Sequence, residues 1–365
     1  MTKLQRLITD LCPSGVPKAK IDNLIAYEQP TRYLVASKSY DDSYSTPVLT
    51  AGQTFLLGFT NEEHGKYPAS VLRPVIIFDD FTTAHKWVDF EFKVKSSAMK
   101  MLTVKPEAPI TLRYFWYVLN TIDIDTSEHA RYWISKVSDL EIPLPPLEIQ
   151  EEIVRILDTF VELDAHLKAE LEARKVQNSH YRDDLFSLGQ RFESEQLREL
   201  CVIKTGKKDV NQGNPHGPFP FFTCSRAHTY SDSYSFDTEA LLIAGNGEVG
   251  LVQYFEGKFE AYQRTYVLTD FRKVQSRYLF QYLKAYLVDH LSTLKQDGTI
   301  SYIKLAMLAD FMIPVPPVEI QNDFIAKFEK FEKLEFELGS ELVARKSQYE
   351  YYRTKLLTFK EMDVA

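Results

Sequence analysis

One glycine-rich segment of the chain has the spacing of a dinucleotide-binding loop. Gly245 to Gly250 fit the pattern GxGxxG and follow a short apolar run, Leu241–Ala244, as a cofactor loop would follow a strand. Such a loop must then open a helix, because the helix N-terminus holds the pyrophosphate. The next residues, Leu251–Gly257, instead have the composition of a second strand. The pattern therefore favours a glycine-rich hairpin over a cofactor site.

A second group of residues resembles the acidic centre of a metal-dependent nuclease. Asp79 and Asp80, followed by Glu91 and Lys93, supply the carboxylates and the lysine of such a centre. Glu91 and Lys93, however, alternate with large apolar residues, which is the pattern of a half-buried strand. The spacing therefore favours a structural strand over a nuclease site.

The remaining catalytic patterns are incomplete. Asn214–Phe219 departs from the AsnProProTyr motif of amino-methyltransferases at its third position, and no glycine-rich methyl-donor loop accompanies it. The chain has no P-loop, and its eight histidines show no HExxH or HxxxH spacing. Cys12, Cys201 and Cys224 form no CxxC pair, so we expect reduced, buried thiols rather than a disulfide or a zinc site. We predict no catalytic residue and no metal ligand.

Polar residues gather instead in loops whose side chains could contact nucleic acid. Arg, Lys, Asn and Gln grip phosphates and bond to base edges, and Ser, Thr and His assist them. Ordinary solvated loops have the same composition, and that alternative stays open. The candidates for DNA binding in the first part of the chain are Arg32, Asn61, His64, Lys66, Thr82, Thr83 and Lys100. Those in the second part are Lys207, Lys208, Asn211, Arg226, Asn246, Arg264 and Thr299.

An internal repeat dictates the architecture that must position these loops. The segment IPLPPLEIQ at Ile142–Gln150 returns as IPVPPVEIQ at Ile313–Gln321, and roughly 19 of 47 ungapped positions are identical. After each proline-rich turn, apolar residues recur every three or four positions, as in a coiled-coil seam. Each copy predicts a helix of about 40 residues, or roughly 60 Å. Two such helices in one chain are natural antiparallel partners.

The segments between the repeats read as short strands and helices bounded by turns. The chain therefore has an α+β fold class, with two mixed α/β domains, two long helices in an antiparallel coiled coil, and a pseudo-twofold internal repeat. We place the first mixed domain at residues 1–141, where 1–16 form a short helix near the C-terminal helix. The first long helix spans 142–188, the second mixed domain 189–312, and the second helix with its tail 313–365.

Composition limits the class of protein. The net charge of −8 argues against a simple basic nucleic-acid binder. The acidity lies on the long helices, which carry −5 over residues 142–188 and −2 over 313–365, so each mixed domain can hold a local basic face. No apolar run reaches the length of a membrane span, and the N-terminus lacks the shape of a signal peptide. We expect a cytoplasmic protein without a membrane partner.

The doubled proline turn and long helix resemble the DNA-specificity (S) subunit of type I restriction–modification systems. Pro47–Gly52, Ile77–Thr83 and Lys93–Lys100 are similar to one recognition domain of that family, and Lys204–Lys208 with the Gly245–Gly250 turn to the other. The resemblance implies two target-recognition domains that bind the halves of a split, asymmetric site in double-stranded DNA. It also implies spacer helices that dock two methyltransferase (M) subunits, and a restriction (R) subunit that can join them.

The resemblance further implies that this chain catalyses nothing and holds no cofactor, with S-adenosylmethionine bound by the partner methyltransferases. Two alternatives remain open on the residues alone. A coiled-coil scaffold that assembles proteins without touching DNA shares the helices, but leaves two mixed domains without a role. A self-sufficient methyltransferase or nuclease needs a methyl-donor or metal site, which the motifs above do not supply.

Overall fold

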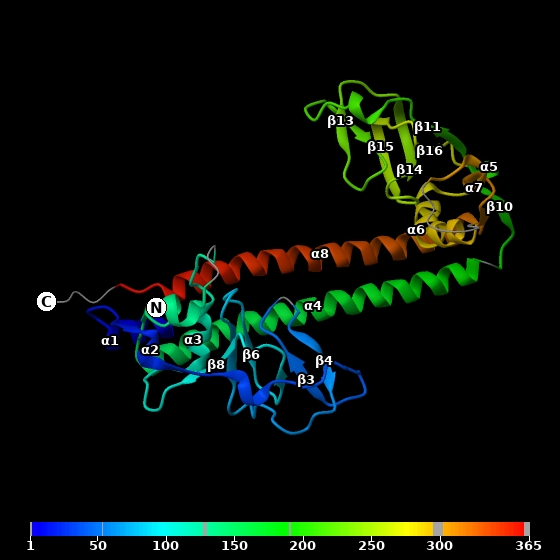
Figure 1. Ribbon diagram of the computed structural model, residues 1–365. Helices are drawn as coiled ribbons and strands as arrows, with labels where there is room; N and C mark the ends of the chain where they lie inside the picture. The colour runs from blue at the N-terminus through cyan, green and yellow to red at the C-terminus, as the bar shows by residue number, and fades with distance from the viewer. Residues whose placement is uncertain (1, 53, 127–129, 190, 295–301, 361–365) are drawn as a thin grey trace. The chain divides into compact units, whose positions relative to one another are not determined.

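The computed structural model describes residues 2–52, 54–126, 130–189, 191–294 and 302–360, with only the backbone of 185, 188 and 189 (Figure 1). The chain forms two compact units. Unit 1 consists of residues 1–166 and 342–365, and unit 2 of residues 167–341. Each unit holds a mixed α/β domain and part of both long helices, which confirms the predicted fold class. The domain boundaries drawn from the sequence stay predictions.

Unit 1 contains two small sheets in addition to the β1–β9 strand pair. The first is antiparallel with the order β2-β8-β5-β6, and the second has the order β4-β3-β7, where β3 pairs antiparallel with β4 and parallel with β7. The strands are β1 (Lys18–Lys20), β2 (Ile25–Glu28), β3 (Thr46–Leu49), β4 (Leu56–Thr60), β5 (Val75–Asp79), β6 (His85–Val88), β7 (Lys93–Val94), β8 (Met99–Val104) and β9 (Glu141–Pro143). The short helices are α1 (Lys3–Leu11), α2 (Ile21–Leu24), α3 (Leu112–Leu119), the 3-10 turn η1 (Pro30–Tyr33) and the π-helical turn η2 (Trp133–Val137).

Strand β5 lies between two hydrophobic clusters, because side chains alternate across a strand. Ile76 and Phe78 belong to the cluster that includes α3, and Val75 and Ile77 belong to the cluster behind the β3 sheet. All four side chains are fully buried. The continuous apolar run in the sequence is therefore a central strand covered on both faces.

Unit 2 is organised around one six-stranded sheet of order β11-β16-β14-β15-β12-β13, in which only the β12–β15 pair is parallel. Leu241 and Ile243 of β14 face helix α6, and Leu242 faces a second cluster. The strands are β10 (Ser194–Gln196), β11 (Val202–Thr205), β12 (Phe219–Phe222), β13 (Thr229–Ser231), β14 (Phe236–Ala244), β15 (Val252–Ala261), β16 (Thr265–Thr269) and β17 (Met312–Pro314). The helices are α5 (Leu197–Leu200), α6 (Ser276–Thr293), α7 (Leu305–Ala309) and the 3-10 turn η3 (Val210–Gln212).

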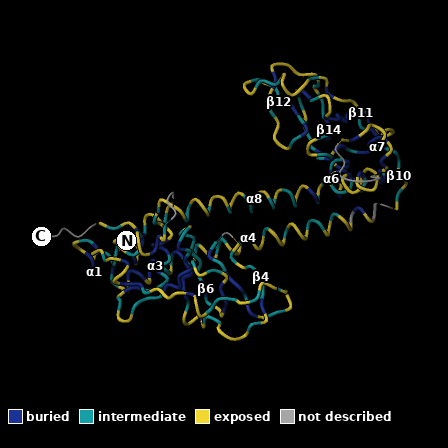
Figure 2. The backbone as a smooth tube through the Cα atoms, in the orientation of Figure 1, coloured by how far each residue is buried: buried dark blue, intermediate teal, exposed yellow. Residues whose placement is uncertain are grey.

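The two long helices are α4 (Leu147–Gly189) and α8 (Val318–Leu357), and each starts directly after its proline pair rather than at it. In unit 1, the ring of Phe160 packs on Tyr352 at 5.6 Å between centroids. In unit 2, Asn178 donates to Glu335, Tyr181 packs on Phe331, and Phe186 packs on Phe328. The residue number of the partner on α8 therefore decreases as the residue number on α4 increases. This order confirms the predicted antiparallel pairing. The middle of both helices is exposed or half-buried (Figure 2).

The internal repeat extends beyond the aligned sequence. In unit 1, β1 pairs antiparallel with β9 just before the first long helix. In unit 2, β10 pairs in the same way with β17 just before the second. A four-residue helix follows each first strand, α2 in unit 1 and α5 in unit 2. Each unit therefore closes the base of its long helix with the same strand pair.

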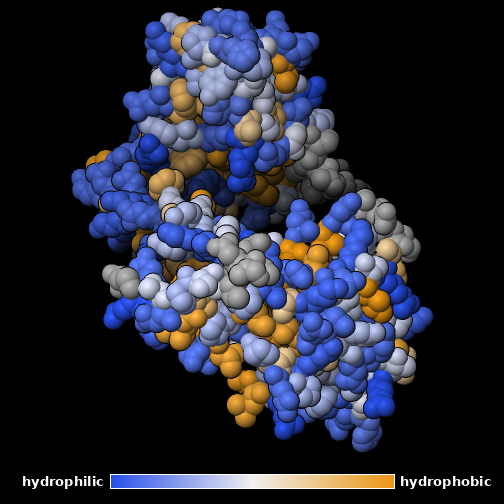
Figure 3. All heavy atoms as spheres, turned by 90° about the vertical axis from the view of Figure 1, so that its left-hand side faces the viewer, coloured by the Kyte–Doolittle hydropathy of each residue, from blue (hydrophilic) through white to orange (hydrophobic). Residues whose placement is uncertain are grey.

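The surface in Figure 3 is mostly hydrophilic, with hydrophobic side chains in separate patches. Within the described ranges, no helix combines the length and the hydropathy needed to cross a membrane. The three cysteines are free and buried, as predicted. Across the same described residues, no cluster of three or more His, Cys, Asp or Glu side chains could hold a metal ion.

Candidate nucleic-acid interface

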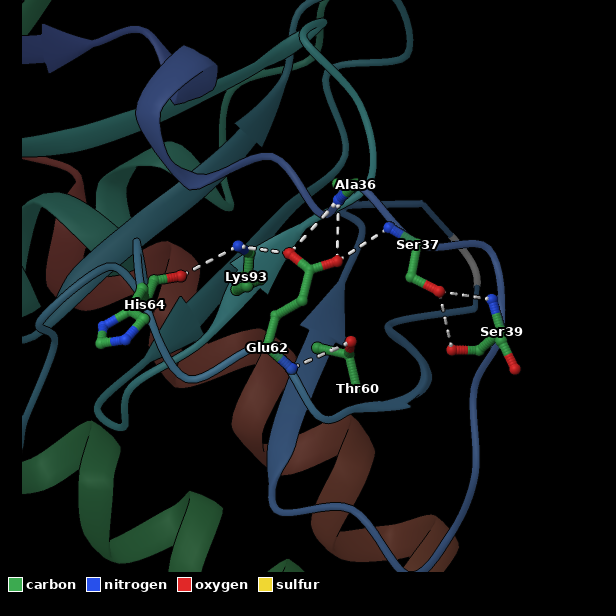
Figure 4. Close-up of polar contacts among 7 residues, drawn as sticks. All are labelled: Ala36, Ser37, Ser39, Thr60, Glu62, His64 and Lys93. Atoms are coloured by element: carbon green, nitrogen blue, oxygen red, sulfur yellow. Dashed lines mark hydrogen bonds and ion pairs between the residues drawn. The ribbon is translucent and has the colours of Figure 1, made fainter.

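The loop that follows β4 in unit 1 is held by one carboxylate (Figure 4). Glu62 accepts hydrogen bonds from the backbone N–H groups of Ala36 at 3.0 Å and Ser37 at 2.7 Å, and its Oε2 lies 2.7 Å from Nζ of Lys93. Lys93 also donates to the carbonyl of His64 at 3.0 Å. The Lys93 ammonium and the Ser37 N–H hold the pKa of the Glu62 carboxyl below its ordinary value. The loop is therefore fixed from beneath, while Asn61 and His64 are exposed above it.

A second contact brings this loop against the turn η1. Gly65 adopts a left-handed φ of 66°, and a Cβ atom there would lie 3.0 Å from the carbonyl oxygen of Arg32. Only glycine meets both conditions without strain. Arg32 is exposed, and Lys66 forms a half-exposed ion pair with Glu91 at 2.9 Å. Arg32, Asn61, His64 and Lys66 therefore come from adjoining segments, which fits a surface that could contact a phosphate backbone.

The β5–β6 turn presents two further candidates. Asp79 accepts hydrogen bonds through Oδ1 from the N–H groups of Phe81 and Thr82, both at 2.9 Å. Thr83 has a left-handed φ of 59°, which is rare for a β-branched residue. Its N–H donates to the carbonyl of Asp79, and its own carbonyl lies 2.9 Å from Nδ1 of His85. Thr82 is exposed at the tip of this fixed turn.

The prediction that Lys100 contacts DNA is wrong. Its side chain is fully buried in β8, and Nζ lies 3.2 Å from Oδ2 of Asp80, which is 1% exposed. The ammonium also lies over the ring of Tyr27 at 5.4 Å from the centroid. Lys93, predicted on the outer side of a half-buried strand, likewise points inward to Glu62 and is 7% exposed. In both cases, a lysine in a segment of polar composition has a buried side chain that pairs with a carboxylate.

In unit 2, four turns meet at one end of the sheet. The carbonyl of Arg264, between β15 and β16, accepts from the N–H of Gly245 at 2.9 Å and from Sγ of Cys224 at 3.4 Å. The N–H of Glu248 donates to the carbonyl of Cys224, and the N–H of Arg226 donates to the Glu248 carboxylate at 2.8 Å. These bonds join residues 224–226, 245–248 and 264 into one surface, which we call the unit 2 turn cluster. The fourth segment, residues 206–209, joins through the carbonyl of Lys208, which accepts from the N–H of Gln263.

The GxGxxG segment helps to build this cluster. It is the hairpin turn between β14 and β15, as predicted. A Cβ atom on Gly245 would lie 2.3 Å from the Arg264 carbonyl oxygen. Gly247 has a φ of 63°, and a Cβ there would lie 2.7 Å from the Cys224 carbonyl oxygen. The glycines therefore allow three backbone turns to approach closely.

The predicted site residues of unit 2 divide into exposed and anchored side chains. Lys207, Asn211, Arg226 and Arg264 are exposed, and Asn246 is half-exposed within the turn cluster. Lys208 is anchored: Nζ donates to Ser231 and Ser233 at 2.7 Å each and lies 3.4 Å from the buried carboxylate of Glu260. Its charge is thus already compensated, and Lys207 is the more available cation of this segment. Thr299 lies outside the described residues.

An open groove of about 670 Å³ adjoins the turn cluster and was not predicted. Arg226, Lys284 and Phe280 are among its lining residues. Lys284 projects from α6 and lies 3.3 Å from Glu332. A pattern search overlooks Lys284 because it sits in an amphipathic helix, where lysine is an ordinary surface residue. It also overlooks Glu62 and Glu260, and it considers Asp80 only as a nuclease carboxylate, since each acts through a partner distant in the sequence.

Comparisons with known proteins agree on one family. The sequence model of the type I restriction modification DNA specificity domain matches the chain twice, at residues 20–173 and 190–343. The type I restriction enzyme EcoR124I/EcoR124II specificity subunit of Escherichia coli is 36% identical, with 98% of this chain and 97% of that protein aligned. The EcoDI specificity subunit of Escherichia coli is 34% identical over 37% of this chain and 30% of that protein.

Solved structures share the fold. The crystal structure of the type I restriction-modification S subunit from M. genitalium superposes with a TM-score of 0.66 at 17% identity, covering 93% of this chain and 96% of that one. A chain from a structure on the complex assembly and conformational transition of the type I R-M system gives a TM-score of 0.53 at 16% identity, covering 94% and 98%. At these identities the likeness concerns the fold alone.

Proposed function

Because the chain belongs to the type I restriction modification DNA specificity family, we propose that it selects the DNA sequence on which a restriction–modification complex acts. The curated relatives are specificity subunits, the non-catalytic component of such systems. In the proposed mechanism, the mixed domain of each unit is a target-recognition domain that binds one half of a split, asymmetric site. The long helices act as the spacer and recruit two methyltransferase subunits, and a restriction subunit can join.

One observation carries the proposal: the two units share the same scaffold, but their candidate DNA-contacting surfaces are built from different turns. Each unit anchors its long helix with the same strand pair. The candidate contact residues, in contrast, sit on different turns: the loop 61–66 with η1 in unit 1, and the turn cluster in unit 2. Contacts to phosphates fix the position of a protein on DNA, whereas side chains that reach base edges determine which sequence is bound. Two different surfaces on the same scaffold are therefore suited to two half-sites of different sequence.

The proposal assigns methyl transfer, and the S-adenosylmethionine it consumes, to the partner subunits in the cytoplasm. The test is methylome sequencing of a host that carries the methyltransferase gene with or without this chain. A split motif methylated only when the chain is present supports the proposal. A scaffold that never touches DNA predicts the same methylated sequence in both hosts, or none, and methylation by the purified chain alone would indicate an enzyme.

A domain exchange tests the division of labour between the units. Replacing residues 17–141 with the corresponding domain of another specificity subunit should change one half of the methylated motif and leave the other half intact. A change in both halves, or in neither, contradicts the assignment of one half-site to each domain. The reciprocal exchange of residues 189–312 serves as the matched control.

A further inference from the structure

The buried Asp80–Lys100 pair is unusual among the ion pairs of unit 1. Lys100 is fully buried and Asp80 is 1% exposed, with 3.2 Å between Nζ and Oδ2. Beyond this contact, neither atom has a hydrogen bond among the described residues. Moving two charges out of water is costly, and a pair with unfilled hydrogen-bonding capacity recovers little of that cost. Apolar residues of similar volume would stabilise this position at least as well, so the pair calls for another role.

Asp80 connects three separate segments of unit 1. Its N–H donates to the carbonyl of Ala98 at 3.0 Å, and its carbonyl accepts from the N–H of Tyr132 at 2.8 Å. Its Oδ1 accepts from the N–H of Trp133 at 2.9 Å. Lys100 holds the other carboxylate oxygen. The orientation of Asp80 is therefore fixed from four directions, and Asp80 is the first residue after β5.

The turn that carries Thr82 and Thr83 follows Asp80 directly in the chain. Asp79 binds the N–H groups of Phe81 and Thr82. Thr83 is held at a φ of 59°, a conformation that persists only where the surroundings over-determine it. Strained backbone of this kind gathers at binding sites. The turn exposes Thr82, whose short polar side chain can contact either a base edge or a phosphate.

We propose that the Asp80–Lys100 pair is a positioning device that sets the 81–84 turn as a base-reading element of the first recognition domain. The inference rests on the proposed function and deepens it, because it names a specificity-determining turn and the residues behind it. Asp80 and Lys100 do not touch DNA. They act through the geometry of Thr82 and Thr83.

The test compares two pair replacements. Asp80→Leu/Lys100→Met removes both charges and the bond to Trp133, whereas Asp80→Asn/Lys100→Met keeps a carbonyl oxygen for Trp133 and preserves folding most closely. Each variant is assembled with its methyltransferase subunits, and thermal unfolding is recorded first. Binding is then measured to duplexes carrying the wild-type methylated motif and to duplexes with single base changes in either half.

We expect Asp80→Asn/Lys100→Met to unfold near the wild-type temperature, and Asp80→Leu/Lys100→Met to unfold at a somewhat lower temperature because it leaves the buried Trp133 N–H without an acceptor. Discrimination should fall roughly 5- to 150-fold at one or two base pairs of the half-site read by residues 17–141, which is the loss of about 1–3 kcal/mol per base pair. Discrimination at the other half-site should not change. Thr82→Val should reproduce part of the effect without touching the pair. Lys20→Met/Asp139→Leu, which removes an exposed ion pair of the same unit, is the control and should have no effect.

Unchanged discrimination in both folded pair variants would overturn the proposal, as would an equal loss at both half-sites. If the wild-type complex itself shows no sequence preference, the proposed function fails instead, and the two failures are thereby distinguished.

Discussion

Gln150 and Gln321 make the same three hydrogen bonds in the two units. Oε1 of Gln150 accepts from the N–H of Thr111, and Nε2 donates to the carbonyls of Pro109 and Pro145. Oε1 of Gln321 accepts from the N–H of Gln275, and Nε2 donates to the carbonyls of Lys273 and Pro316. Each glutamine thus ties its proline turn to the N-cap of the preceding helix, α3 or α6.

This equivalence explains the chemistry of the repeated IPxPPxEIQ segment. The glutamine side chains are fully buried, and a buried amide must fill its hydrogen bonds. A proline-rich turn has few N–H groups, so its carbonyls need a donor from elsewhere. Tyr114 and Tyr278 complete the pattern by donating to the carbonyls of Pro143 and Pro314, both at 3.1 Å. The repeated segment therefore forms the same hydrogen-bonded connection, which we call the joint, between each mixed domain and the long helix that follows it.

Replacing either glutamine by leucine should destabilise its unit. Gln150→Leu leaves the Thr111 N–H and two carbonyls without their partner, and each such loss costs about 1 kcal/mol or more. We expect each variant to lower the free energy of unfolding by about 2–4 kcal/mol, measured by urea denaturation. Gln177→Leu, at an exposed position of α4, is the matched control. Equal stability of the control and the variants would contradict the proposed joint.

The internal repeat made the two long helices and their pairing predictable from the sequence, whereas the candidate site was predictable only in part. A proline pair, an acidic first turn and a seam of apolar residues are local signals, and they correctly predicted α4, α8 and their antiparallel pairing. The hairpin at Gly245 was predictable for the same reason. The burial of Lys100 was not, because its partner Asp80 directly follows the neighbouring strand β5, and their contact depends on strand order. Composition cannot distinguish a lysine that faces solvent from one that faces a buried carboxylate.

Neutralising Glu62 should release the loop that carries Asn61 and His64. Glu62→Gln removes the charge that Lys93 pairs with, although the amide oxygen can still accept from Ser37. We expect roughly tenfold weaker binding to the first half-site, since a charge-assisted hydrogen bond contributes about 1.5–3 kcal/mol and part of it here orders the loop. Titration of the assembled complex with duplexes altered in either half measures this. Glu63→Gln changes an exposed neighbour and should bind as the wild type does.

The link between α1 and α4 should weaken in acid. Arg155 and Lys3 hold the pKa of Glu152 at about 2, below its ordinary value of 4.5. A carboxyl whose pKa is lowered by folding stabilises the protein fully above its unfolded value and loses this contribution as the pH falls through the folded value. The destabilisation caused by Glu152→Gln should therefore be largest above pH 5 and should shrink as the pH falls toward 2.

Urea denaturation of Glu152→Gln between pH 6 and pH 3 tests this dependence. The effect is modest, because Lys3 and Arg155 are mostly exposed and water screens their charges. Glu151→Gln, at the exposed preceding position, is the matched control. A difference for Glu152→Gln that stays constant over this range would show that the ion pairs do not account for its effect.

Removing an exposed arginine from the unit 2 turn cluster should change the salt dependence of binding. Arg226 and Arg264 are exposed, and their backbones are fixed by Glu248 and Gly245, so either replacement leaves the turns intact. Each cation that neutralises a phosphate contributes about one unit to the slope of log K against log salt concentration. Arg226→Ala and Arg264→Ala should each reduce that slope by about 1 and weaken binding most at low salt. Arg272→Ala, an exposed arginine outside the cluster, should keep the wild-type slope. If both cluster variants also keep it, the turn cluster does not contact the phosphate backbone, and the second half-site must be read from another face of unit 2.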